Sequence, residues 1–176
     1  MLWSLTTSLQ RHTVLPMQTQ PEVTTWNAAA AEAVREMIQR NSNAQDLSAL
    51  RTFYDEMSRR IAEPEIDAAV VAAMWSEFGG RCRASAPLLT GQSFLWGTVI
   101  DTVISKQRDY GKENILRFGQ TGLVVRTHDK LARLEHLKAH AATPNHESLA
   151  DTVLDLVGYS VIGLMLARGW FDYPLV

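Results

Sequence analysis

The chain has 176 residues, which is enough for one substantial hydrophobic core and too few for two large independent domains. Hydrophobic residues make up 46% and charged residues 20%, a globular composition that excludes a disordered or collagen-like chain. A formal net charge of −2 gives no general attraction to phosphate backbones, so we expect no binding to nucleic acid polymers.

Three features of the sequence bear on location. The single cysteine, Cys82, excludes an internal disulfide framework and is typical of a reducing compartment. The first residues, MLWSLTTSLQRH, lack the basic region and the continuous apolar core of a secretory signal. Asp151 and Asp155 interrupt the most apolar stretch, so we expect no membrane-spanning segment and a cytoplasmic protein.

The first half of the chain predicts an arm followed by three helices. Residues 1–23 carry Pro16 and Pro21 without a sustained period, as an extended arm would. Strong helix formers and helical spacing of apolar residues follow. The expected helices are 26–40 after a Thr25 cap, 47–62 after an Asp46 cap, and 65–78 with Pro64 in its first turn and Gly79-Gly80 at its end.

A looser stretch at 81–92, with Pro87 and Gly91, suggests an organisational boundary. We therefore expect an N-terminal arm and helical extension at 1–90 and a helical core at 91–176, joined in one compact unit.

The second half also predicts helices. Helical spacing resumes at 93–108, and 109–111 turns the chain. Residues 112–122 are expected to form a loop with one turn of helix, followed by a helix at 123–139 and a long apolar helix at 145–168. No stretch alternates as a strand would, so the predicted fold class is all-α, a multi-helix bundle.

The last of these helices carries an acidic stripe. Glu147, Asp151 and Asp155 recur every four residues, which would stack them along one side of a helix. Ionised carboxylates beside so much apolar surface need a basic side chain or a metal ion to offset their desolvation.

A matching set of charges lies on the preceding helix: Arg126, Asp129, Lys130 and Arg133. A short loop makes the two helices antiparallel neighbours. The facing charges can form an internal salt-bridge ladder, or hold a divalent metal ion and the phosphates bound to it. Mg²⁺, with Mn²⁺ as a second candidate, would take Asp129, Glu147 and Asp151, and the basic side chains would contact phosphate.

Lys106, Asp109, Tyr110 and Asn114 cluster around the predicted turn. Turn chemistry alone explains the Asp and the Asn. Lys106 and Tyr110 suit a phosphate-binding cation and a base-stacking ring, so all four are candidate substrate-binding residues.

The motifs DYG at 109–111, G-x-x-x-R-x-x-DK-x-x-RL from Gly122 and ES-x-x-DT-x-x-DL-x-x-Y from Glu147 resemble a family common in bacteriophages, the nucleotide modification associated domain 1 family. Residues 1–90 are outside the resemblance. The family is itself similar to the MazG-like all-α nucleoside triphosphate pyrophosphatases. Their first acidic helix has no copy here, and Asp129 with Lys130 and Arg133 stands in its place.

The resemblance implies a MazG-like core and a Mg²⁺-dependent nucleoside triphosphate pyrophosphohydrolase, in which water attacks the α-phosphorus to give monophosphate and pyrophosphate. Glu147 and Asp151 would be the catalytic residues, and Asp155 would orient the ligand or pair with Arg133. It also implies a homo-oligomer and, for a phage-encoded chain, the host cytoplasm.

Two alternatives from other classes remain open at this point. A protein that binds a nucleotide without cutting it would use the same pocket. A structural scaffold would use the acids and bases as a core salt-bridge network, and would bind neither metal nor nucleotide.

Overall fold

The computed structural model describes residues 22–140 and 147–176, and within them it contains helices and no strand, which confirms the all-α multi-helix bundle. The arm expected at 1–23 and the loop around Pro144 lie almost entirely outside the described residues. The helices are α1 (Trp26–Arg40), α2 (Leu47–Ile61), α3 (Ala68–Thr90), α4 (Trp96–Tyr110), α5 (Glu113–Leu116), α6 (Gly119–Ala139) and α7 (Leu149–Ala167).

The first two helices begin where the sequence predicts. Thr25 caps α1 by accepting a hydrogen bond from the Ala28 amide at 3.2 Å, and Asp46 caps α2 by accepting one from the Ala49 amide at 2.8 Å. Each side chain satisfies an amide that has no partner within the helix.

The prediction for the third helix was wrong at both ends. It begins at Ala68 after an Asp67 cap, and it continues through Gly79-Gly80 to Thr90, with Cys82 buried in its middle. A Cβ atom on Gly79 would lie 2.7 Å from the Cβ of Ser160. The glycine therefore permits close contact with α7 and does not end the helix. The loop expected at 81–92 is mostly helix.

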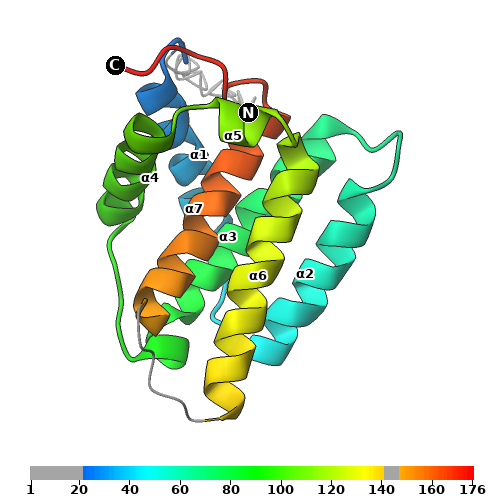
Figure 1. The fold of residues 1–176 in the computed structure, drawn as a ribbon, viewed down its shortest axis with the longest axis vertical. Helices are drawn as coiled ribbons and strands as arrows, with labels where there is room; N and C mark the ends of the chain where they lie inside the picture. The colour runs from blue at the N-terminus through cyan, green and yellow to red at the C-terminus, as the bar shows by residue number, and fades with distance from the viewer. Residues whose placement is uncertain (1–21, 141–146) are drawn as a thin grey trace, which may run out of the picture.

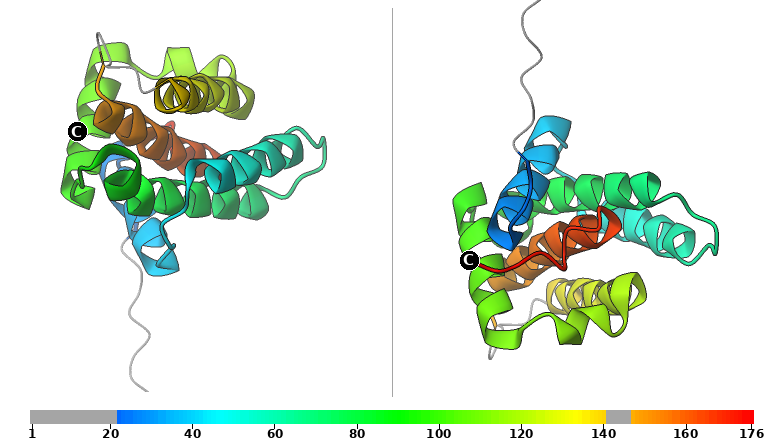
Figure 2. Two further views of the ribbon diagram at one scale, coloured as in Figure 1. Left: turned by 90° about the horizontal axis from the view of Figure 1, so that it is seen from below. Right: turned by 90° about the horizontal axis from the view of Figure 1, so that it is seen from above.

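Helix α7 is the centre of the bundle. Figures 1 and 2 show it between α6 on one side and α3 with α1 on the other, with α4 at one edge and α2 at the opposite edge. By length and composition α7 could cross a membrane. Here it is the core helix, and its fully buried apolar side chains are Val153, Leu156, Val157, Val161, Leu164 and Met165.

Buried side chains from both halves of the chain form one cluster, from Trp26 on α1 to Phe171 after α7. Helices α4 and α6 both lie beside α7, and the short α5 connects the end of α4 to the start of α6 (Figure 1). This arch of α4, α5 and α6 over α7 positions the candidate site.

A hydrogen-bonded chain joins α3, α6 and α7. The indole Nε1 of Trp75 donates to the Gln120 side-chain oxygen at 2.7 Å, and the Gln120 amide nitrogen donates to the Gly163 carbonyl at 2.9 Å. A Cβ atom on Gly163 would lie 2.5 Å from the Trp75 ring. Only a glycine lets the indole rest on α7 in this way.

We expect Gly163→Ala to destabilise the fold by about 1–3 kcal/mol, because the buried Trp75 ring must move into a packed core. Urea unfolding followed by circular dichroism measures the loss. The control is Gly97→Ala on α4, where no neighbouring atom lies within 4 Å of the added Cβ. That change should be neutral or stabilising by up to about 1 kcal/mol. Equal stability of the two variants would contradict the contact.

Candidate functional site

A cavity of about 430 Å³ lies between α4, α5, α6 and the side of α7 that they flank, and we call it the α4–α7 cavity. Its volume is in the range of small-molecule sites. Its lining residues are Val103, Lys106, Gln107, Tyr110, Gly111, Asn114, Ile115, Arg126, Lys130, Glu147, Asp155, Tyr159 and Ile162.

Two lysines and two acids are paired at one end of the cavity. The Nζ atom of Lys130 lies 2.7 Å from Oε2 of Glu147 and 2.6 Å from Oδ2 of Asp155. The other oxygen of Asp155 binds Lys106. With Arg126, which also lines the cavity, we call these residues the charged end.

The Lys130 ammonium is held in its charged form. Burial lowers the pKa of Lys130, but its hydrogen bonds to Asp155 and Glu147 raise the pKa more, so the net pKa lies above the ordinary lysine value. The Asp155 side chain is only 12% exposed, and with a lysine on each oxygen it is an anchor for both cations.

Helix α6 and the first turn of α7 fix Glu147 in place. Arg133 donates hydrogen bonds to the Glu147 carbonyl and to the Thr152 hydroxyl. The buried Thr152 lies with its hydroxyl 3.0 Å from Oε1 of Glu147. Arg133 therefore supports the segment that carries Glu147 and does not line the cavity, although the sequence suggested a phosphate contact.

Helix α7 begins four residues later than the sequence suggested, and this changes the acidic stripe. Ser148 caps the helix, so Glu147 precedes it. Asp151 completes a capping box, in which its carboxylate accepts a hydrogen bond from the Ser148 amide at 3.2 Å and the Ser148 hydroxyl in turn accepts one from the Asp151 amide at 3.0 Å. Asp151 is exposed, and its carboxylate is occupied by the helix cap.

The three acids expected to hold a metal ion are not brought together. Asp129 is exposed on α6, near Tyr54 of α2, and does not line the cavity. Within residues 22–140 and 147–176 no group of three or more His, Cys, Asp or Glu side chains converges as metal ligands. The two acids that do converge, Glu147 and Asp155, have a lysine ammonium between them. The expected set of Asp129, Glu147 and Asp151 thus does not fit a Mg²⁺ ion.

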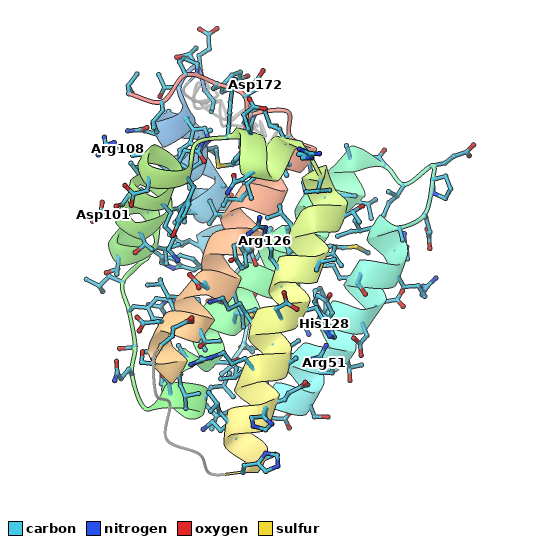
Figure 3. The ribbon with its side chains drawn as sticks, in the orientation of Figure 1. Arg51, Asp101, Arg108, Arg126, His128 and Asp172 are labelled. Atoms are coloured by element: carbon cyan, nitrogen blue, oxygen red, sulfur yellow. The ribbon has the colours of Figure 1, made fainter. Side chains whose placement is uncertain are left out.

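Basic groups outnumber acids in the lining, with Lys106, Arg126 and Lys130 against Glu147 and Asp155. Arg126 is half-buried, and it makes no ion pair with any described residue. Figure 3 shows it on α6 beside α7, in the region that α4 and α6 flank. A guanidinium without a described ion-pair partner, beside two fixed lysines, has the chemistry to bind an anion that can accept several hydrogen bonds.

Seven of the residues selected from the sequence line the cavity: Lys106, Tyr110, Asn114, Arg126, Lys130, Glu147 and Asp155. Asp109, Asp129, Arg133 and Asp151 do not. The sequence analysis missed Gln107 and Tyr159. The sequence did contain an indication for Gln107: it follows the apolar residues Val99 and Val103 at a spacing of four, so a polar side chain falls on the buried face of the helix.

Comparisons of the chain with family models, curated proteins and solved structures gave no match. The resemblance described above therefore depends on its motifs alone.

A second polar network joins α2 to α6, away from the cavity. Arg51 donates to both carboxylate oxygens of Glu135, at 2.7 and 2.5 Å, and its Nη1 lies 3.2 Å from Nδ1 of His128. Figure 3 labels Arg51 and His128 between the two helices. The hydrogen bond from Arg51 lowers the pKa of Glu135 below the ordinary glutamate value of 4.5. This network is a structural link between the helices.

We expect Glu135→Gln to lower the melting temperature by about 1–4 °C at pH 7, since the ion pair between α2 and α6 is lost. A lowered pKa means that the pair stabilises the fold above pH 4.5 and that this stability is lost as the pH falls through the folded-state pKa. The difference from wild type should therefore shrink below pH 4.5. Thermal unfolding across pH 3–7 measures it, with the exposed Glu65→Gln as control. A difference that is constant with pH would contradict the assignment.

Proposed function

We propose that this chain binds a nucleotide in the α4–α7 cavity, with the phosphate group at the charged end. The observation that supports this most is that Arg126, which has no ion-pair partner in the described part of the chain, lines the cavity beside Lys106 and Lys130. A phosphate group offers several acceptor oxygens and negative charge to these cations.

The acids of the charged end favour binding over a dedicated metal centre. Asp155 and Glu147 are neutralised by lysines, so they hold the cations in place for a ligand. Preorganised cations lose little side-chain entropy when a phosphate binds. A Mg²⁺ ion carried by the phosphates of a nucleotide is compatible with this arrangement, since it brings most of its own ligands.

Tyr110 favours a nucleotide among phosphorylated ligands. The residue is 70% exposed and lines the cavity. An exposed aromatic ring at the cavity is a stacking surface for a base.

We expect Arg126→Gln to weaken nucleotide binding by about 10- to 150-fold, the range for losing hydrogen bonds to a charged group. Isothermal titration calorimetry with nucleoside mono-, di- and triphosphates, with and without Mg²⁺, measures the change. The control is Arg40→Gln, an exposed arginine at the end of α1 that does not line the cavity. If no nucleotide binds wild type, or if both variants bind equally well, the proposal is wrong and the charged end is a structural network.

Incubation of the protein with the same nucleotides distinguishes binding from hydrolysis. We expect chromatography to detect no monophosphate and pyrophosphate formed from triphosphates in the presence of Mg²⁺. Product formation that stops on chelation would favour the pyrophosphohydrolase that the family resemblance implies. In that case Asp151→Ala is decisive, because Asp151 belongs to the helix cap in this structure. Loss of turnover without loss of stability in that variant would return Asp151 to the catalytic role expected from the sequence.

A further inference from the structure

Six residues that line the α4–α7 cavity carry no charge, and we call this part of the lining the uncharged end. It consists of Val103, Gln107, Tyr110, Ile115, Tyr159 and Ile162. Val103 and Ile115 are buried, and Tyr159 and Ile162 are half-buried. Apolar walls with two aromatic rings suit a flat ring system better than a sugar or an ion.

Gln107 is the polar exception in these walls. Its side chain comes from the face of α4 that also buries Val99 and Val103, and the residue is only 9% exposed. Its amide has no hydrogen-bond partner among the described residues, although it lines the cavity. The amide atoms are not sealed from solvent, so in this largely buried side chain they face the open cavity, where they can bond to a ligand that enters it.

The two parts of the lining together span a length that suits one ligand. Asp155 at the charged end and Ile162 at the uncharged end are seven residues apart on α7, which corresponds to about 10 Å along the helix axis. A nucleotide has its phosphate and its base at opposite ends of a ribose, so it can reach both.

We infer that Gln107 is the specificity-determining residue of the cavity, pairing its side-chain amide with the edge of a nucleobase at the uncharged end. A glutamine side-chain amide offers one hydrogen-bond donor beside one acceptor. It can therefore pair bidentately with a base edge that has an acceptor beside a donor, as N7 and N6 of adenine do. Sugar phosphates lack such an edge. The inference rests on the proposed function, because it needs the phosphate at the charged end.

The test compares ligands that share a phosphate and differ in having a base. Calorimetry with the four nucleoside 5′-monophosphates identifies the tightest binder, and ribose 5-phosphate serves as the ligand without a base. In Gln107→Leu, the affinity for that nucleotide should fall about 5- to 150-fold, the value of one bidentate amide pair. The affinity for ribose 5-phosphate should be unchanged.

Two further variants keep the test decisive. Gln107→Glu has nearly the same shape as the native side chain and replaces its donor group, so it should lose the nucleotide preference even if the leucine variant does not fold. Gln92→Leu changes an exposed glutamine outside the cavity and should bind as wild type does.

The outcomes separate this inference from the proposed function. If nucleotides bind in an Arg126-dependent way but both Gln107 variants keep the wild-type preference over ribose 5-phosphate, Gln107 does not read the base and only this inference is overturned. If neither nucleotides nor ribose 5-phosphate bind the wild-type protein, both are overturned.

Discussion

Three helices of this protein are tied together by the side-chain amide of Gln120. From α6 it accepts a hydrogen bond from Trp75 on α3 and donates one to the Gly163 carbonyl on α7. Because α6 and α7 run antiparallel, the contact fixes which later residues of α6 face which earlier residues of α7. Lys130, ten residues after Gln120, thereby comes level with Asp155, eight residues before Gly163. The candidate site depends on this register.

The acids that suggested a metal centre have separate tasks in the folded chain. Asp151 closes the first turn of α7, Asp155 holds Lys106 and Lys130, and Glu147 lies before the helix and holds Lys130 from the other side. The acids thus fix cations at one end of a cavity, and Arg126 adds a cation that no described acid neutralises. These cations and the uncharged lining beside them support the proposal that a phosphate group and a ring bind here.

Local signals in the sequence predicted the helices well where no tertiary contact opposed them, as the caps Thr25 and Asp46 show. Gly79 misled the prediction, because a glycine that permits close packing against Ser160 looks the same in sequence as one that ends a helix. The Ser148-x-x-Asp151 capping box could have been recognised in the sequence, and it would have removed Asp151 from the candidate metal ligands. The pairing of Asp155 with Lys106 could not be predicted, because those residues lie 49 positions apart and meet only through the packing of α4 on α7.

The most direct test of the central claim is a ¹⁵N-resolved NMR titration of the whole chain with inorganic pyrophosphate in the absence of divalent metal. The account predicts saturable shifts confined to residues 103–115, 126–130 and 147–155, with residues 51–58 of α2 unchanged. Phosphate would then be bound by the charged end without a metal ion. Shifts that appear only after Mg²⁺ is added, or that lie outside the α4–α7 cavity, would contradict the account.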